Sequence, residues 1–192
     1  MSHSFFNSMT GRLASMKKIA ILGGSGAGKS TLAKKLGTFL NISVYHLDAI
    51  HWQPGWQALD REVFNAEQQK ILDEDAWIID GNYSRTIDSR LQQADTIIFL
   101  HYRTIRYLYG IIKRRIQYRN KTRPDTGKDC PEKIDWEFFI WVLRFNSNQA
   151  PAIYQELNQI HDKTILIFHS PKQLKRFLMQ LDTAHHDNLI DS

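Results

Sequence analysis

Cysteine is nearly absent from this chain: of 192 residues, only Cys130 is a cysteine. A single cysteine excludes an internal disulfide framework and a cysteine-rich zinc site. No apolar run approaches the about 20 residues that a membrane-spanning helix needs, and residues 1–15 lack the basic-then-apolar order of a secretory leader. We therefore expect a protein of the reducing cytoplasm that has no membrane partner.

Acidic residues are missing from one long segment, 101–123, which holds eight Lys or Arg. The whole chain has a net charge of +5, whereas the chain without this segment has 17 basic and 20 acidic residues, a net charge of −3. The positive charge is therefore local. A generally cationic surface of the kind that coats nucleic acid would spread it along the chain.

The chain does contain five short apolar runs, separated by helical patterns. They are residues 19–22, 44–47, 77–79, 96–100 and 164–168. Nearly continuous apolar runs of this length are typical of strands in a parallel sheet that is covered on both faces. The alternation of strand and helix predicts a doubly wound, three-layer α/β/α fold.

Helices are expected between these strands at 30–39, at 61–72 and after Ser84, and a last one begins at Pro171. Asp60 is placed to cap the second of these helices, and Ser170 to cap the last. We expect one domain over 16–183, preceded by a disordered extension at 1–15 and followed by a tail at 184–192.

The segment between the fourth and fifth strands is too long for one crossover. Its first part, 102–118, reads as a helix with an apolar face formed by Ile105, Leu108, Tyr109, Ile112 and Ile116. Residues 119–133 are rich in charge, Pro and Gly and read as a mobile loop, and 135–145 reads as an aromatic helix. An inserted lid at about 113–133, over a phosphate site, would have this layout.

The most specific motif is Gly-Gly-Ser-Gly-Ala-Gly-Lys-Ser at 23–30, which fits the phosphate-binding loop G-x-x-x-x-G-K-[ST]. Its glycines let backbone N–H groups point at a phosphate chain, and the following helix aims its N-terminus at the same anion. Lys29 would reach the β/γ-phosphates, and Ser30 would bind Mg²⁺. The residues expected to hold the nucleotide are Gly23, Gly24, Ser25, Gly26, Ala27, Gly28, Lys29, Ser30 and Thr31.

Two aspartates follow predicted strands, at the edge where ligands collect in such sheets. Asp80 ends the third strand and is the candidate second ligand, with Ser30, for Mg²⁺. Asp48 follows the second strand and is the candidate for orienting or deprotonating an acceptor hydroxyl. The alternative for both is a turn or helix-capping aspartate.

Aromatic residues surround Asp48. His51, Trp52 and Trp56 are candidate acceptor contacts, and the two tryptophans form either an aromatic wall for a flat substrate or a core plug under a loop. A metal site built from the histidines is not expected, because no third ligand appears at suitable spacing.

Arginines are the remaining candidates. Arg114, Arg115, Arg119 and Arg123 would serve as lid arginines that hold phosphate oxygens, or else form a solvated basic face. No acid interleaves them to form ion pairs. Arg144 is the only charge between Phe138 and Asn148, and it either contacts a phosphate or extends to the surface.

Taken in order, four features carry a family resemblance: the loop at 23–30, the segment 48–56, Asp-Gly-Asn-Tyr at 80–83, and the arginine-rich segment before a Trp-Phe helix. Together they resemble the DNA topology modulation protein family, a branch of the adenylate kinase and shikimate kinase group of P-loop proteins. The resemblance implies a five-stranded parallel sheet in the order 2-3-1-4-5 and an arginine-bearing lid. His101 departs from the family, which tends to have Asp there.

The resemblance also implies that the acceptor lies after the second strand and that Asn82, Tyr83 and Arg85 contact it, with Arg85 gripping an acceptor phosphate. The leading interpretation is a kinase that uses ATP and Mg²⁺ to phosphorylate a nucleoside, a nucleotide or another small hydroxylated metabolite. The alternative is a nucleotide-switched regulatory NTPase that binds nucleic acid and modulates DNA topology.

Overall fold

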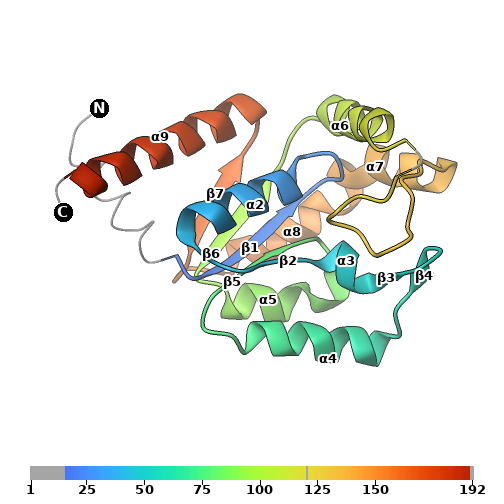
Figure 1. The fold of residues 1–192 in the computed structure, drawn as a ribbon, viewed down its shortest axis with the longest axis horizontal. Coiled ribbons are helices and arrows are strands. Elements are labelled where there is room, and N and C mark those ends of the chain that lie inside the picture. Colours follow the sequence, from blue (N-terminus) through green and yellow to red (C-terminus); the bar gives the residue numbers. More distant parts are fainter. Residues whose placement is uncertain (1–15, 120, 191–192) are drawn as a thin grey trace.

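The computed structural model describes residues 16–119 and 121–190, with side chains as far as Leu181. The extension expected to be disordered, 1–15, lies outside the described residues. The described chain forms a twisted sheet with helices on both of its faces (Figure 1). No helix in the described part of the chain is long and apolar enough to cross a membrane.

Five parallel strands form the central sheet, in the order β2-β5-β1-β6-β7. Their bounds are β1 Lys18–Gly23, β2 Val44–His46, β5 Trp77–Asp80, β6 Thr96–Leu100 and β7 Thr164–Phe168. Counted along the chain these are the five predicted strands, and their order is the expected 2-3-1-4-5. The register pairs Asp80 with both Ile21 and His46, so the carboxyl ends of β1, β2 and β5 meet at one edge.

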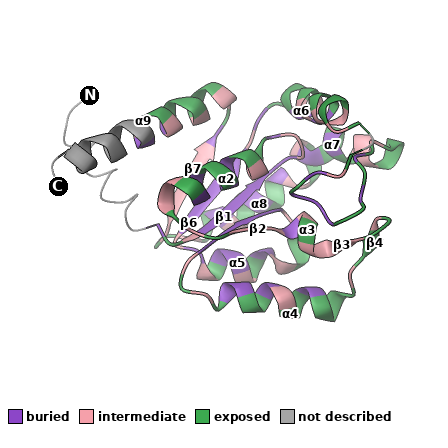
Figure 2. Cartoon of the chain, viewed as in Figure 1, coloured by how far each residue is buried: buried purple, intermediate pink, exposed green. Residues whose placement is uncertain are grey.

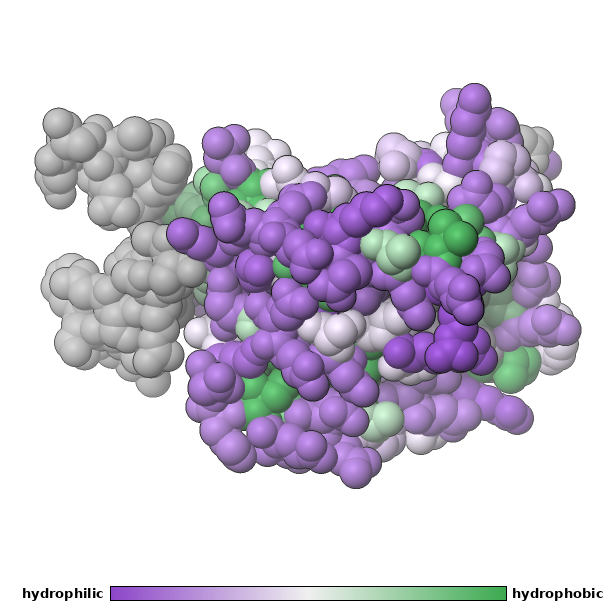
Figure 3. All heavy atoms as spheres, turned by 90° about the horizontal axis from the view of Figure 1, so that it is seen from below, coloured by the Kyte–Doolittle hydropathy of each residue, from purple (hydrophilic) through white to green (hydrophobic). Residues whose placement is uncertain are grey.

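Helices cover the sheet in two layers. Figure 1 shows α2 (Lys29–Leu40) and α9 (Pro171–Ile190) on one face, and α4 (Arg61–Leu72) and α5 (Ile87–Gln93) on the other. The Asp60 side chain caps α4 as expected, accepting from the amides of Glu62 and Val63. The outward side of the layer that contains α4 is mostly hydrophilic (Figure 3), as a layer that faces water should be.

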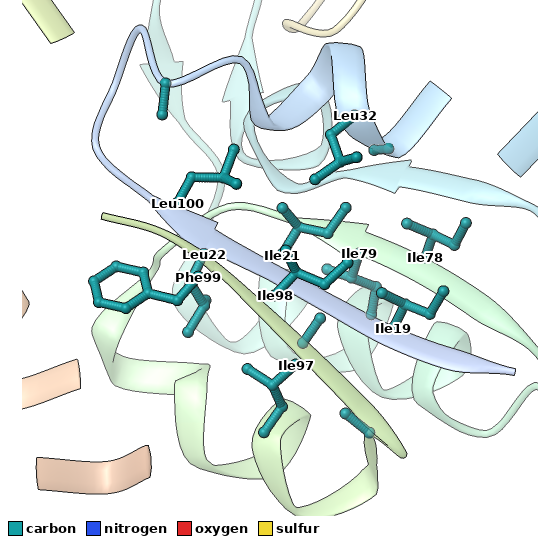
Figure 4. Packing of buried hydrophobic residues seen from close by; sticks show 14 of the residues in the cluster. Ile19, Ile21, Leu22, Leu32, Ile78, Ile79, Ile97, Ile98, Phe99 and Leu100 are labelled. Atoms are coloured by element: carbon teal, nitrogen blue, oxygen red, sulfur yellow. The ribbon is translucent and has the colours of Figure 1, made fainter. Parts of the chain in front are cut away.

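The core lies between these layers and is centred on β1 and β6. Ile19, Ile21, Ile97 and Ile98 have no exposed surface. Figure 4 shows Ile21 and Ile98 on the side of the sheet that faces Leu32 of α2, and Ile97 on the opposite side. Each buried side chain of this size contributes roughly 1.5–3 kcal/mol relative to an exposed one. Strands β1, β5 and β6 are nearly continuously buried, as their unbroken apolar runs indicated, whereas the edge strands β2 and β7 are mostly half-buried.

The long connection between β6 and β7 contains α6 (Thr104–Gln117), a loop, α7 (Trp136–Asn148) and α8 (Ala150–Asn158). The Asp135 side chain caps α7 by accepting from the Phe138 amide at 2.9 Å. Parts of the loop between α6 and α7 are buried (Figure 2), although the sequence pattern indicated a mobile loop.

The apolar face predicted for α6 exists, but most of it points away from the core. Ile105 is 69% exposed and Ile116 is 74% exposed, and Tyr109 and Ile112 are also exposed. The face that packs inward instead presents Tyr107 and Ile111. Helical spacing found the stripe, but it does not tell which side of the helix meets the protein.

Three smaller elements were not anticipated: α8, the helix α3 (Leu47–His51) and a hairpin of β3 (Trp52–Gln53) and β4 (Gln57–Ala58). Helix α9 continues to Ile190, through most of the segment expected to be a tail at 184–192, because no Gly or Pro interrupts it.

Candidate active site

The phosphate loop, residues 23–30, joins β1 to α2 at the centre of the carboxyl edge of the sheet. Gly26 and Gly28 have φ values of 82° and 92°, a left-handed conformation that only glycine adopts without strain. The first turn of α2 begins with a bond from the Leu32 amide to the Gly28 carbonyl, at 3.0 Å. The amides before Leu32 are those that a helix start leaves without intrahelical partners.

Two contacts fix this loop from outside. The side-chain amide of Asn82 pairs with the backbone of Gly23, accepting at 3.0 Å and donating at 2.9 Å. Gly26 lies against Gly110 of α6 so closely that a Cβ on Gly110 would overlap the Gly26 carbonyl. Asn82, expected to bind substrate, is thus engaged with the loop itself. The start of the loop is tied to the end of β5, and its tip to α6.

Lys29 points back into the loop. Its ammonium donates to the carbonyls of Gly23 at 2.8 Å and Gly24 at 3.3 Å. Burial lowers the pKa of Lys29, while the carboxylates of Asp80 and Asp48 act in the opposite direction. The ammonium is held beside the amides by weak neutral acceptors, so a phosphate oxygen is a stronger partner than the ones it has.

Asp80 and His46 form a pair at the ends of β5 and β2. Asp80 is 4% exposed, and His46 Nδ1 is 2.5 Å from Asp80 Oδ1. An ionised carboxylate only accepts, so the imidazole is the donor in this contact. The pairing follows directly from the register that places these two residues side by side.

Asp48 is half-buried and accepts a hydrogen bond from the Tyr83 hydroxyl at 2.9 Å. Burial and the Asp48 carboxylate raise the pKa of Tyr83, so its hydroxyl stays protonated and remains a donor. Tyr83 has φ 34° and Trp56 has φ 64°, which is unusual for bulky residues. Strained backbone of this kind gathers at functional sites, and both of these residues line the cleft described below.

Arg90 was not predicted as a functional residue. It is completely buried, and its guanidinium donates to the carbonyls of Gly81 at 2.6 Å, Tyr83 at 3.2 Å and Asn82. Burial lowers its pKa to about 9, so it stays charged near neutral pH. The signal in the sequence was its position between Ile87 and Leu91, on the inward face of α5.

Two acids of the loop after α6, Glu132 and Asp125, were not among the predicted site residues. Glu132, 3% exposed, is 2.8 Å from Arg114 Nε and 2.6 Å from Arg123 Nε. Asp125 is 2.9 Å from Arg123 Nη1. Although burial opposes it, Arg123 and a hydrogen bond from Ser30 hold the pKa of Asp125 below its usual value. The expectation that these arginines lack acidic partners was wrong, because the partners lie beyond the basic segment and fold back onto it.

This loop is anchored on the β3–β4 hairpin. The Gly55 amide donates to the Asp129 carbonyl at 3.2 Å, and Trp56 Nε1 donates to the Pro131 carbonyl at 3.1 Å. Cys130 Sγ donates to the Gln53 carbonyl at 3.2 Å. The loop therefore bridges from α6 to the region around Asp48, and we call residues 119–135 the lid loop.

A single cleft of ≈ 1630 Å³ runs past the phosphate loop. Pockets for one ligand are typically about 300–1,000 Å³, so the cleft has room for more than one. Strand β1 is the middle strand of the sheet, and the cleft extends from the phosphate loop to both sides of it, so the cleft has two ends. The end that follows β2 and β5, called the Asp48 end, is lined by Asp48, Trp52, Trp56, Asp80, Tyr83 and Ser84. The end that follows β6 and β7, called the α6–α9 end, is lined by Tyr102, Arg106, Tyr109, Pro171, Leu174 and Lys175.

Most of the predicted site residues reach this cleft. Residues 25–31, Asn82, Arg114 and Arg123 line it in addition to the residues of the Asp48 end. Both tryptophans are half-buried there, an arrangement in which they form a wall of the cleft. Gly23 and Gly24, the first two residues of the loop, are buried and do not line the cleft.

Besides Gly23 and Gly24, five predicted residues are absent from the lining. Arg85, Arg119 and Arg144 are exposed elsewhere on the described surface. Arg115 is half-buried, and its Nη1 has no hydrogen-bond partner among the described residues. His51 packs edge-on against Trp52 and Tyr83, and burial lowers its pKa. His101, outside the lining, contacts the Tyr154 hydroxyl at 2.8 Å.

No group of three or more His, Cys, Asp or Glu among the described residues is arranged to hold a metal ion. Mg²⁺ does not require such a group, since it keeps several waters and binds through one or two protein oxygens plus phosphates. The Ser30 hydroxyl and the Asp80 carboxylate, both lining the cleft beside the phosphate loop, have that chemistry.

Among solved structures, the chain is similar to a shikimate kinase from Bacteroides thetaiotaomicron, at 16% identity over 93% of this chain and 100% of that one, with a TM-score of 0.48. It is also similar to a gluconokinase from Sinorhizobium meliloti 1021 (12% identity, 92% and 97% coverage, TM-score 0.46). A third similar structure is a deoxyadenosine kinase from M. mycoides with bound dATP (16% identity, 86% and 99% coverage, TM-score 0.44).

No family model and no curated protein match the sequence. The resemblance to the DNA topology modulation protein family is therefore not confirmed. Structural similarities at these identities and TM-scores assign neither a family nor an activity to this chain.

The contact of α6 with the phosphate loop yields a first prediction. Gly110→Ala should weaken the binding of ATP by about tenfold or more, because tightly packed backbone cannot absorb the added methyl group. Alanine in a helix is otherwise favoured over glycine by about 1 kcal/mol. Titration calorimetry measures the affinity. Ile116→Ala, at an exposed position of the same helix, is the control and should bind ATP like the unaltered protein. Equal ATP affinities for the unaltered protein and both variants would show that the contact between Gly110 and Gly26 does not shape the phosphate loop.

The buried acid of the lid loop yields a second prediction. Glu132→Gln leaves the half-buried Arg114 without a carboxylate and the buried Arg123 with Asp125 alone, and breaking a buried ion pair costs of order 3–5 kcal/mol in comparable cases. The lid loop should then be cut faster by trypsin, which cleaves after its Arg and Lys residues. The exposed Glu62→Gln in α4 is the matched control. If both variants are cut at the same rate as the unaltered protein, Glu132 does not hold the loop.

Proposed function

We propose that this protein is a phosphotransferase that moves the γ-phosphoryl group of ATP to the hydroxyl of a small molecule. The observation that carries the proposal is the single cleft with the phosphate loop at its centre and chemically different ends. A hydrolase or switch needs room for one nucleotide, whereas this cleft extends in both directions from the loop.

The donor fits the α6–α9 end. Arg106, Lys113 and Lys175 give this end positive charge, while Tyr102, Pro171 and Leu174 provide apolar surface for a base. The triphosphate would then run along the loop amides and Lys29. Arg114, which donates to Ser25 Oγ at 3.3 Å, lies over the loop and would contact the terminal phosphate.

The acceptor fits the Asp48 end. Its hydroxyl oxygen forms a bond to the γ-phosphorus while the bond from that phosphorus to the β–γ bridging oxygen breaks, and ADP leaves with the electron pair. The acceptor proton passes to Asp48, which then releases it to water. Asp48 is oriented for this by the Tyr83 hydroxyl.

Mg²⁺ is the ion that the donor set fits, with the Ser30 hydroxyl and the Asp80 carboxylate as its protein ligands. When bound, it would neutralise charge on the β- and γ-phosphates. His46 holds the Asp80 carboxylate in one orientation through their 2.5 Å contact.

The lid loop favours transfer over hydrolysis. It is anchored at the hairpin by the Gly55, Trp56 and Cys130 bonds described above, and Arg123 and Asp125 within it are buried beside the phosphate loop. A covered site excludes the water that would otherwise compete with the acceptor.

The alternative, a regulatory NTPase that binds nucleic acid, has less support. Arg114 is engaged by Glu132 and faces the cleft, and the exposed side of α6 presents Ile105, Ile112 and Ile116. An apolar stripe is a poor match for a phosphate backbone, which binds rows of cations.

The proposal predicts that ADP release depends on an acceptor and that Lys29→Ala lowers the rate by about 10²–10³-fold, the usual cost of losing one group that stabilises transition-state charge. A coupled assay of ADP release, with and without acceptors, measures this. Lys17→Ala, an exposed lysine before β1, is the control. Release that continues at one rate whether or not any acceptor is present would contradict a phosphotransferase.

A further inference from the structure

The charged side chains at the Asp48 end already have partners within the protein, so few of them are free to bind a ligand. Its carboxylates are Asp48, which accepts from Tyr83, and Asp80, which accepts from His46. An acceptor that carried its own negative charge would have to lie beside these two acids. It would need a cation with no other partner to offset that repulsion, because an unpaired charge in such a site is costly.

Arg123 is the most buried cation of the cleft near this end, and it is already paired. It is 7% exposed, with Asp125 2.9 Å from its Nη1 and Glu132 2.6 Å from its Nε. Because Glu132 also pairs with Arg114, the cluster contains two guanidinium groups and two carboxylates and has no net charge. Arg123 therefore cannot attract an anionic acceptor without releasing one of its acids.

Lys133 lies at the rim. Its side chain is 55% exposed, it is 3.6 Å from Asp135, and its ammonium is 5.3 Å from the centroid of the Trp56 ring. A solvated ammonium with its own carboxylate contributes little to binding a second anion.

The two arginines after β5 are not available either. Arg85, the expected grip for an acceptor phosphate, is exposed and does not line the cleft. Arg90 has no exposed surface, and its guanidinium is used by the carbonyls of the 81–83 loop. Among the described residues of the Asp48 end, every cation is thus paired, used by carbonyls or turned away.

Aromatic surface is what this end does offer. Trp52 and Trp56 pack edge to face with ring centroids 5.4 Å apart, and both line the cleft with Tyr83. Aromatic side chains can stack on a flat ring through their apolar faces, and this contact requires no charge on the ligand.

We infer that the acceptor is an uncharged compound with a hydroxyl group and a planar ring, of the nucleoside class, and not a phosphorylated or carboxylated one. The inference rests on the proposed phosphotransferase function and names the acceptor for it. Asp48 would take the hydroxyl, and the tryptophan pair would hold the ring.

Acceptors with and without a negative charge test this. Purified full-length protein with ATP and Mg²⁺ is given each ribonucleoside and deoxyribonucleoside, the corresponding 3′- and 5′-monophosphates, so that each of these hydroxyls stays free in one of them, and glucose against gluconate. Acceptor-dependent ADP release and the mass of the product are measured. At least one nucleoside should exceed both of its monophosphates in kcat/KM by about 100-fold or more, because the charged members meet two carboxylates with no free cation to offset the repulsion.

The outcomes separate the two claims. A monophosphate or gluconate used as well as its neutral counterpart, or better, overturns the inference and leaves the phosphotransferase standing. Glucose used better than every nucleoside overturns the planar-ring part alone. Acceptor-independent ADP release throughout overturns the proposed function, and the inference with it.

Arg85→Ala adds a second readout. Because Arg85 lies outside the cleft, the KM for the preferred nucleoside should stay within about twofold of the unaltered protein. A KM that rises tenfold or more in this variant would show that Arg85 reaches the acceptor, and would contradict the inference.

Discussion

The phosphate loop must keep its amides and the Lys29 ammonium pointed at a space that only an anion fills well. Inside the loop, the Lys29 ammonium donates to the carbonyls of Gly23 and Gly24, but the glycines leave the backbone itself pliable. The restraint comes from its neighbours: Asn82 pairs with the backbone of Gly23, and Gly110 allows α6 to press against Gly26. Both restraints come from segments far away in the chain. The proposed anion site thus depends on how β5 and α6 pack against β1.

The same neighbours organise the rest of the site. The loop that carries Asn82 also carries Tyr83, which orients Asp48, and Arg90 holds that loop from beneath by its carbonyls. Helix α6 carries Arg114 as well as Gly110, and Glu132 joins Arg114 to Arg123 of the lid loop. The elements that shape the phosphate loop are therefore the ones that bring Asp48, Tyr83 and the lid loop to it. In the proposed phosphotransferase they would place two substrates around one phosphate.

Local patterns predicted the fold well. A buried parallel strand and a phosphate-binding motif each consist of consecutive residues. The sequence alone therefore predicted the strands at 19–22 and 96–100 and the loop at 23–30. The inward side of α6 was not, because a stripe such as Ile105 to Ile116 shows spacing but not what it faces. The partners of Arg114 and Arg123 were also missed: Glu132 lies in a loop without periodicity, and only the fold returns it to α6. Gly110 left one signal, a glycine inside a helical pattern, which usually has a packing reason.

The central claim is that the loop amides and Lys29 bind a polyphosphate tail, and the dependence of affinity on phosphate number tests it most directly. Titration calorimetry with AMP, ADP and ATP in the presence of Mg²⁺ should give affinities that rise with each phosphate, ATP binding at least about 100-fold more tightly than AMP, since each added group gains charge-assisted hydrogen bonds. Equal affinities for AMP and ATP would contradict the account.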